Sequence, residues 1–494
     1  MAERRYLAFD IGAESGRAVV GTLADDRLSL EEIHRFANQP VEVCDTLHWD
    51  VLALHSNVLQ GMREYVRRFG HRVDGIAVDT WALDFGLLAR DGKLLQNPVA
   101  YRDRRTEGMV EKALARMPAQ ELYEHTGLNI LPIHTLFQLL ALRASGSPLL
   151  EVATRFLMMP DLIAYFLTGR DAGERTNAIT TQVYDPRSGE WSRRVFETFE
   201  LPLAIMPELV DPATVLGELR EPVREATGLA HAPVVAACTH DTGSAVAAVP
   251  GQGNDWAFIS SGTWSVLGAL TDRVVTSPEA RAARVCNELT LGSRFICRNI
   301  MGLWLLQQSR EAWRRSGQEC SYEELVGLAE RAPDDGPIID PDDLTFLAPP
   351  DMPAAIQGYC TRTGQAAPDG PAAVTRCILT SLALSYRDGL ECLSHLLGHG
   401  FAAVHVVGGG SRNRLLCQLT ADATGLPVRA GPVEATAAGN VLAQALATGD
   451  LGSPSDTREV VRRSTDLIEY APGRREAWDA RYETFAGLRG REDT

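Results

Sequence analysis

The sequence predicts an α/β protein of two domains built on a duplicated core. Its 494 residues exceed what one hydrophobic core usually organises, so at least two domains are expected. A strand–turn–strand pattern occurs near residue 10 and again near residue 260. A strand, a helix and a second strand follow one another between residues 402 and 430, as in a βαβ unit. These observations together favour two related halves that mix strands and helices.

The first half opens with a predicted hairpin. Two apolar runs, 6–12 and 18–21, are joined by a polar turn that contains Gly12 and Gly16. Helical periodicity is expected over 52–69 and over most of 107–170, with Pro132 and Pro160 as breaks. Short buried strands are expected at 73–79 and 233–238.

The second half repeats the hairpin with strands at 256–260 and 264–268. A long amphipathic helix is expected at 371–397. The βαβ unit consists of a strand at 402–407, a helix at 411–424 that stops at Gly425, and a strand at 427–430. We expect one domain over 1–247 and another over 248–494, with Pro250–Asn254 as the hinge.

Composition excludes several classes of protein. With 48 basic and 64 acidic residues the formal charge is −16, which argues against nucleic acid or an anionic membrane as partner. No apolar run reaches the roughly 18 residues of a membrane span, and the N-terminus is unlike a signal peptide. The nine cysteines are scattered, so a cytoplasmic protein is expected; Cys360 and Cys377 would pair only if the fold brings them together. A monomer or a weak homo-oligomer is expected.

The scarcity of lysine restricts any phosphate chemistry. Lys93 and Lys112 are the only lysines, and neither belongs to a Gly-x-x-x-x-Gly-Lys-Ser/Thr loop, which excludes a P-loop enzyme. The glycines at 408–410 lack the third glycine of a dinucleotide fingerprint, since position 413 is Asn413. Phosphate binding would therefore depend on backbone amides, hydroxyls, arginine and a metal ion.

Two turns carry residues suited to that task. Asp10 ends the first strand, where its carboxylate would hold Mg²⁺ directly or through water, and Arg17 would neutralise charge on a transferring phosphoryl group. The alternative is a solvent-facing turn with a surface arginine. The glycines at 408–410 would let backbone amides approach a phosphate or sugar, or else form only a tight turn.

Asp241 is the expected general base. It follows a buried strand, where ligands of α/β proteins gather, and His240 and Thr242 flank it. The alternative, which is compatible with the first, is that Asp241 caps the following helix. Trp81, between Asp79 and Asp84, suits a sugar with apolar faces and hydroxyls. The i, i+4 pair His395 and His399 is more typical of exposed or structural histidines than of a metal site.

Taken in order along the chain, these segments resemble the FGGY carbohydrate kinases, a family with the actin-like ATPase fold, which is ribonuclease H-like. The resemblance covers nearly the whole chain, and it is carried by these stretches: Phe9–Arg17, Asp79–Phe85, Ala100–Asp103, Met159–Asp161, His240–Thr242, Ser260–Ser265, Asn299–Gln307 and Val407–Gly410. Within the family it is greatest to the branch that phosphorylates L-rhamnulose. The resemblance implies two lobes that close on sugar and nucleotide in an interdomain cleft.

The resemblance also implies roles for individual residues. ATP would contact Ala13, Glu14, Ser15, Gly16, Arg17, Thr263, Gln307 and Gly409. The sugar would contact Ala82, His240, Asp241, Thr242 and Asn299. Asp241 would accept the proton, Mg²⁺ would accompany the nucleotide, and the products would be L-rhamnulose 1-phosphate and ADP.

Two positions depart from the pattern of that branch. Ala82 replaces a usual glycine and would reshape the sugar pocket, while Glu14 replaces a small hydroxyl residue in the phosphate turn. The alternatives are a kinase for another ketose or polyol, such as L-fuculose, D-xylulose or glycerol, and a sugar sensor that kept the fold without catalysis. A nicotinamide dehydrogenase is disfavoured by the missing third glycine.

Overall fold

The computed structural model describes residues 3–473 and 475–489. The chain divides into two compact units. The first unit contains residues 1–250, 271–296 and 435–464, and the second contains 251–270, 297–434 and 465–494. The chain thus first enters the second unit after Pro250, and it returns to the first unit twice.

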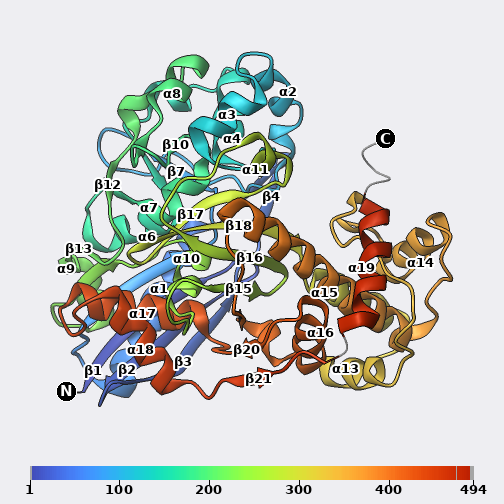
Figure 1. Ribbon diagram of the computed structural model, residues 1–494. Helices are drawn as coiled ribbons and strands as arrows, with labels where there is room; N and C mark the ends of the chain where they lie inside the picture. Colours follow the sequence, from blue (N-terminus) through green and yellow to red (C-terminus); the bar gives the residue numbers. More distant parts are fainter. Residues whose placement is uncertain (1–2, 474, 490–494) are drawn as a thin grey trace. The chain divides into compact units, whose positions relative to one another are not determined.

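The first unit is built on a sheet in the order β13-β14-β6-β1-β2-β3. Its strands are β1 (Arg4–Ile11), β2 (Ser15–Ala24), β3 (Arg27–Ala37), β6 (Gly75–Thr80), β13 (Thr214–Glu218) and β14 (Pro233–Ala236). β1 and β2 form the expected antiparallel hairpin beside β3 (Figure 1). β6 runs parallel to both β1 and β14. All six residues of β6 are buried, as is typical of a strand with parallel neighbours on both sides.

The sheet of the second unit has the order β21-β20-β19-β15-β16-β18-β17; its first six strands repeat this arrangement, and β17 (Cys286–Thr290) is an additional edge strand. Its strands are β15 (Trp256–Ser261), β16 (Trp264–Thr271), β18 (Ser293–Met301), β19 (Ala403–Val407), β20 (Val428–Ala430) and β21 (Ile468–Tyr470). β15 and β16 pair antiparallel, and β19 runs parallel to both β15 and β20. The expected duplicated core and the expected βαβ unit are therefore confirmed.

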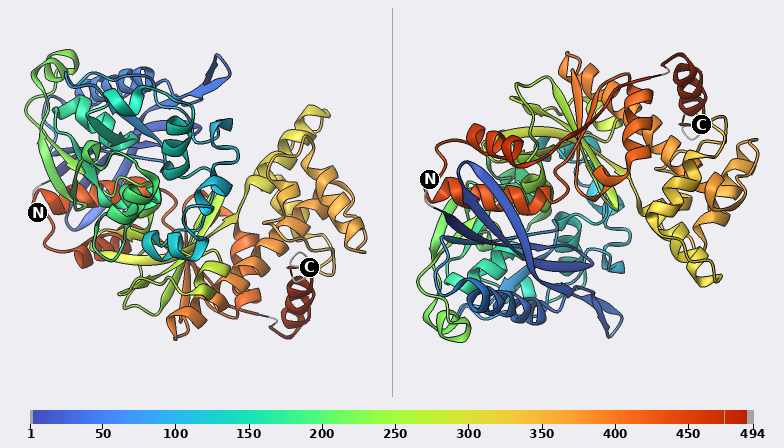
Figure 2. Two further views of the ribbon diagram at one scale, coloured as in Figure 1. Left: turned by 90° about the horizontal axis from the view of Figure 1, so that it is seen from above. Right: turned by 90° about the horizontal axis from the view of Figure 1, so that it is seen from below.

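Helices surround the sheet of the first unit. They are α1 (Val51–Phe69), α2 (Met109–Leu114), α3 (Ala119–Thr126), α4 (Thr135–Ala144), α5 (Leu149–Val152), α6 (Met159–Thr168), α7 (Arg175–Ala178), α8 (Arg193–Phe199), α9 (Glu221–Thr227), α10 (Asp241–Ala247), α11 (Pro278–Ala282), α17 (Ala435–Ala447) and α18 (Pro454–Ser464). α17 packs on β1 and β6, and α18 packs on β3, so that the red helices of Figure 2 lie along the blue strands. α1 begins where Asp50 accepts a hydrogen bond from the Ala53 amide at 3.0 Å.

Short strand pairs complete the first unit. They are β4 (Val41–Val43) with β5 (Thr46–His48), β7 (Phe85–Leu88) with β8 (Arg155–Met158), β9 (Ala172–Glu174) with β12 (Glu208–Val210), and β10 (Tyr184–Asp185) with β11 (Glu190–Trp191). β17 (Cys286–Thr290) lies in the segment 271–296 and packs on α7 and α10.

The helices of the second unit are α12 (Trp304–Arg315), α13 (Tyr322–Glu330), α14 (Met352–Arg362), α15 (Gly370–Leu397), α16 (Arg414–Thr424) and α19 (Arg475–Arg489). α15 matches the long helix expected at 371–397. Cys360 and Cys377 do lie together in this unit, as two free thiols joined by a hydrogen bond that lowers the pKa of Cys360. Among the described residues, no helix has the length and apolar character needed to cross a membrane.

The expectation of helix over most of 107–170 is wrong in one place. β8 interrupts that stretch and pairs antiparallel with β7, Phe85 lying opposite Met158. Pro160 stands in the first turn of α6, where a missing amide hydrogen costs nothing, so it opens a helix there rather than breaking one.

Candidate active site

The turn between β1 and β2 is stabilised by a hydrogen bond inside the turn and by Asn38, the residue after β3. The Gly12 amide donates to the Ser15 carbonyl at 2.9 Å. Asn38, which follows β3 and is buried, donates through Nδ2 to the Gly12 carbonyl at 2.8 Å and through its amide to the Glu14 carbonyl at 2.9 Å. Sequence reasoning missed Asn38, which no local pattern relates to this turn.

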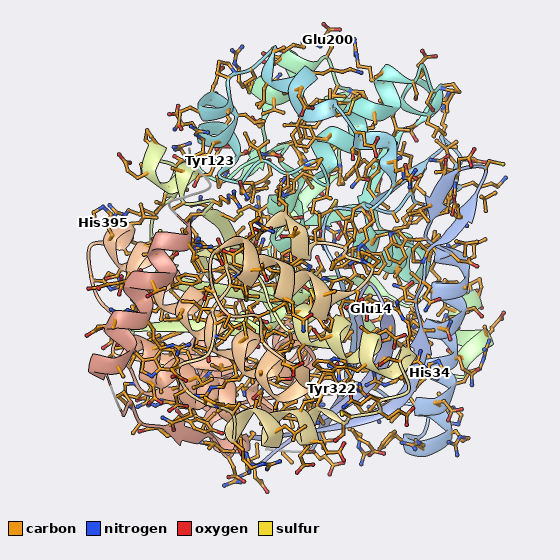
Figure 3. All side chains as sticks on the ribbon, turned by 90° about the vertical axis from the view of Figure 1, so that its right-hand side faces the viewer. Glu14, His34, Tyr123, Glu200, Tyr322 and His395 are labelled. Atoms are coloured by element: carbon orange, nitrogen blue, oxygen red, sulfur yellow. The ribbon has the colours of Figure 1, made fainter. Side chains whose placement is uncertain are left out.

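The side chains of the turn differ in exposure. Glu14 is exposed and is labelled in Figure 3, whereas Ala13, Ser15 and Arg17 are partly buried. Gly16 is buried, and a Cβ there would lie 2.2 Å from the Phe36 ring. The glycine at 16 is thus explained by packing, while the Glu14 side chain is free to extend into solvent.

Carboxyl groups gather at the ends of β1 and β6. Asp10 and Asp79 are register partners in the two parallel strands. Burial raises the pKa of Asp79 well above its usual range, and the carboxylates of Asp10 and Asp241 raise it further, against the hydrogen bond from Asn440 Nδ2 to Asp79 Oδ2 at 2.5 Å. The buried Oδ1 of Asp79 has no hydrogen-bond partner in the described part of the chain.

These carboxylates are suited to a magnesium ion that arrives with a nucleotide. The residues described contain no group of three or more His, Cys, Asp or Glu side chains able to hold a metal ion. Mg²⁺ usually keeps several waters and takes one or two protein carboxylates together with substrate phosphates. Asp10, with the carboxyl groups of Asp79 and Asp241 nearby, fits that single-ligand role.

Asp241 is the first residue of α10, and His240 occupies the N-cap position, so Asp241 is not the cap itself. The Thr242 amide and hydroxyl donate to Asp241 Oδ1, at 2.6 and 3.2 Å, and His240 Nε2 lies 3.4 Å from the same oxygen. The Asp241 side chain keeps 34% of its surface exposed. Burial raises the pKa of Asp241, and Asp10 adds to this, although the neighbouring His240 opposes it.

A buried carboxylate fixes the strand end that leads to Asp241. Glu174 Oε2 accepts hydrogen bonds from the Thr239 amide at 2.9 Å and from the Thr239 hydroxyl at 2.8 Å. The Thr176 hydroxyl also donates to Glu174, and the Thr239 carbonyl in turn accepts from the Thr80 amide at 2.9 Å. Residues 239–241 are therefore tied to both β6 and α7.

A second buried glutamate faces His240 from β17. Glu288 Oε2 lies 3.2 Å from His240 Nδ1, and both side chains are almost fully buried. Burial lowers the pKa of His240, but the carboxylates of Glu288 and Asp241 outweigh burial and raise it above its ordinary value. Sequence reasoning missed Glu288, since it lies 48 residues along the chain and in no recognisable motif.

The segment around Ala82 is a strained and heavily braced turn. Leu83 has φ +82°, a left-handed conformation that branched side chains rarely adopt. Its carbonyl accepts hydrogen bonds from Thr135 Oγ1 at 2.6 Å and from Gln138 Nε2 at 3.3 Å. Thr135 and Gln138 are buried on α4.

The carboxylate of Asp84 stabilises the same turn by accepting three hydrogen bonds. Its Oδ2 accepts from the indole nitrogens of Trp49 at 2.6 Å and Trp81 at 2.9 Å, and its Oδ1 accepts from Gln138 Nε2 at 3.1 Å. Burial raises the pKa of Asp84 to about 6 in spite of these donors. The side chains of Trp81 and Asp84 are buried, so they support the turn, and only Ala82 and Leu83 are partly exposed.

In the second unit, two of the expected nucleotide contacts lie together. Thr263 Oγ1 donates to Gln307 Oε1 at 3.2 Å, and the Thr263 carbonyl accepts from the amides of Gly302 and Trp304. The β15–β16 turn is thus fastened to the start of α12. Asn299 lies on β18 with an exposed side chain.

The three consecutive glycines have different reasons to be glycine. Gly408 has φ +80°, and a Cβ on Gly410 would lie 2.0 Å from Ser261 Oγ, so these two are required by the turn and its packing. A Cβ on Gly409 would meet no atom within 4 Å. Gly409 is therefore the glycine of the three that neither backbone strain nor packing explains.

The two units carry the architecture of a known family. Residues 5–248 match the N-terminal domain of the FGGY family of carbohydrate kinases, and residues 257–448 match its C-terminal domain. The chain belongs to this family, whose members are sugar kinases with the actin-like two-domain fold.

Individual relatives and structures agree with this assignment. The chain is 40% identical to a rhamnulokinase from Bacteroides thetaiotaomicron (98% of this chain, 99% of the relative) and 40% identical to a rhamnulokinase from Enterococcus faecalis (95% of each). Among solved structures it is similar in fold to a ligand-bound xylulose kinase from Lactobacillus acidophilus, with a TM-score of 0.83 at 14% identity over 99% and 98% of the two chains. It also matches Plasmodium falciparum glycerol kinase with ADP, with a TM-score of 0.78 at 16% identity over 99% and 97%.

Proposed function

We propose that this protein transfers the γ-phosphoryl group of ATP to L-rhamnulose, giving L-rhamnulose 1-phosphate and ADP. The name and near-complete coverage of the relatives at 40% identity support the sugar. The observation that carries the chemistry is the placement of Asp241: a partly exposed carboxylate at the start of α10 with one oxygen held by the protein.

Asp241 would act as the general base. All the contacts found for its carboxylate within the described chain fall on Oδ1, so Oδ2 is the oxygen able to face a sugar hydroxyl. The proton of the 1-hydroxyl would move to Oδ2 as the sugar oxygen bonds to the γ-phosphorus. The bond from that phosphorus to the bridging oxygen would break, and ADP would leave with the electron pair.

The sugar would be held beside this base by Ala82, His240, Thr242 and Asn299. The bracing of the turn at Leu83 supports a specificity role for Ala82, because strain of this kind persists where a precise shape is needed. Residues 1–247 would thus form the sugar-binding and phosphate-loop domain.

The family resemblance supplies the proposed contacts to the nucleotide. Ala13, Glu14, Ser15, Gly16 and Arg17 would surround its phosphates, while Thr263, Gln307 and Gly409 of the domain 248–494 would contact its remaining parts. Asp10 would hold Mg²⁺ directly or through water. When bound, the cation would neutralise phosphate charge during transfer.

Ala82 favours one second candidate, a kinase for a different ketose or polyol. A methyl group in a sugar pocket changes discrimination between similar substrates by about 1–3 kcal/mol, enough to change the preferred sugar. The bracing of the turn does not choose between these sugars.

Release of ADP by purified protein with Mg·ATP, measured over L-rhamnulose, L-fuculose, D-xylulose and glycerol, tests the proposal. We expect the highest kcat/KM with L-rhamnulose and a loss of at least about 100-fold in Asp241→Asn. Preferred turnover of another sugar would overturn the substrate. Sugar binding without turnover of any of them would instead point to a sensor.

A further inference from the structure

The residues 271–296 return to the first unit and press β17 against the start of α10. Asn287 anchors the strand, since its Nδ2 donates to the carbonyls of Gly127 at 2.9 Å and Val275 at 2.8 Å, and its Oδ1 accepts from the Val275 amide at 2.8 Å. Thr290, at the end of β17, donates through Oγ1 to the carbonyl of Gly243 on α10 at 2.6 Å.

The approach between the two elements is as close as the backbone allows. A Cβ on Gly243 would lie 2.9 Å from the Leu289 carbonyl oxygen. Between Asn287 and Thr290, Glu288 meets His240 at 3.2 Å. Contacts of the neighbouring residues Asn287 and Thr290 therefore fix the position of Glu288. Its contact with His240 is thus part of the packed interior and not a surface ion pair.

His240 lies between two carboxylates. Its Nδ1 faces Glu288 and its Nε2 faces Asp241 at 3.4 Å. A neutral imidazole has one N–H, so with two ionised carboxylates one ring nitrogen would direct a lone pair at a negative oxygen. The arrangement is electrostatically favourable when the ring carries both protons, because the imidazolium charge then lies between two carboxylates.

The charge on His240 matters because it lowers the pKa of Asp241, whereas burial raises it. A cation beside Oδ1 favours the ionised form of the carboxylate, and only that form can take a proton from a hydroxyl. Glu288 lies beside the ring of His240, which in turn lies beside Asp241, so Glu288 can act on Asp241 through that ring.

We propose that Glu288 is a positioning residue for phosphoryl transfer: it holds His240 as an imidazolium that keeps Asp241 ionised and directs Asp241 Oδ2 at the sugar. This rests on the proposed role of Asp241 as general base. Other ionisable groups also act on these three residues: Glu174 on His240; Asp10, Asp79 and Tyr101 on Asp241; and His134 and Cys286 on Glu288.

The test uses Glu288→Gln, which removes the charge and keeps the shape. With the negative partner gone, the pKa of His240 should fall by about one unit or more, so the imidazolium is lost at lower pH. We expect the alkaline limb of kcat/KM to move to lower pH by a similar amount. Activity at pH 6 should stay within about threefold of the wild type, KM for ATP should not change, and Glu288→Asp should restore part of the profile.

Titration of His240 by NMR, assigned from the signal missing in His240→Gln, gives a readout independent of turnover. The kinetic arm uses whichever sugar of the panel the wild type phosphorylates, so a wrong sugar and a wrong role for Glu288 are told apart. Glu218→Gln is the matched control, because it removes the carboxylate of an exposed Glu–His pair with His231 at 3.8 Å. It should change neither readout.

Three results would overturn the inference. One is an unchanged pKa of His240 in Glu288→Gln, and another is an equal loss of activity at every pH. If that variant does not fold, the wild type alone decides: a His240 that titrates below its ordinary pKa of about 6.5 contradicts the proposal, and one that titrates above it supports it.

Discussion

Arg17 donates two hydrogen bonds to the same oxygen of Asp10, from Nη2 at 2.7 Å and from Nε at 3.0 Å. The two residues are opposite one another in the β1–β2 hairpin, and both side chains are largely buried. The residue proposed for the cation and the residue proposed for the phosphates are thus already partners. Arg17 supplies positive charge beside Asp10, which lies opposite the buried Asp79.

Replacing Arg17 by Gln should weaken nucleotide binding. A charge-assisted hydrogen bond is worth about 1.5–3 kcal/mol, so KM for Mg·ATP should rise by roughly tenfold or more, while KM for the sugar changes little. Steady-state kinetics with each substrate varied in turn measures both values. Arg68→Gln, which removes an exposed ion pair with Glu31, serves as the control and should leave both unchanged. An equal rise in both KM values would contradict a role at the phosphates.

Thr135→Val should impair sugar binding. Valine keeps the shape of threonine but loses the hydrogen bond to the carbonyl of the strained Leu83, whose turn carries Ala82. Leaving that carbonyl with one donor fewer should cost about 1 kcal/mol of stability and raise KM for the sugar severalfold. Calorimetry and kinetics measure the two effects.

The matched control for this change is Thr126→Val on α3. Thr126 is equally buried, and its hydroxyl donates to the Leu122 carbonyl within its own helix at 2.8 Å. It should leave KM for the sugar unchanged. If Thr135→Val and Thr126→Val raise KM for the sugar equally, the hydrogen bond from Thr135 to Leu83 has no specific role in sugar binding.

Changes at Ala82 should alter the choice of sugar. Ala82→Gly removes one methyl group and should shift the ratio of kcat/KM between two ketoses by about tenfold or more. Ala82→Val should lower kcat/KM for the preferred sugar by at least as much. The substrate panel measures these ratios. An unchanged ratio in both variants would place Ala82 outside the pocket.

Gly439→Ala should destabilise the first unit. A Cβ at this position of α17 would lie 1.9 Å from the Ser244 carbonyl oxygen of α10, so the helices would have to separate. Overpacking of this kind costs about 1–3 kcal/mol, and activity should fall too because α10 carries Asp241. Thermal unfolding measures the loss of stability.

Gly358→Ala on α14 is the control for that substitution, since its Cβ would meet no atom within 4 Å. Alanine has the higher helix propensity, so this variant should be as stable as the wild type or slightly more so. Unchanged stability in Gly439→Ala would mean that the contact between α10 and α17 is looser than the structure has it.

Elements specified by short-range patterns were predictable. The two hairpins, the helix 371–397 and the βαβ unit follow from alternating or helical periodicity and from glycines at the turns, which act within a few residues. β8 was not predictable, because its four residues become a strand only by pairing with β7, about 70 positions earlier. Local propensity could not supply that partner.

The candidate site divides in the same way. Asp10, Asp241, Thr263 and the glycines at 408–410 stand at strand ends and turns, which the sequence by itself identifies from apolar runs followed by polar residues. The side chains that surround them come from distant segments, such as Asn38, Gln138, Glu174 and Glu288. Only the tertiary structure decides these partners, and with them the charge on each carboxylate, since burial and hydrogen bonding depend on what folding brings near.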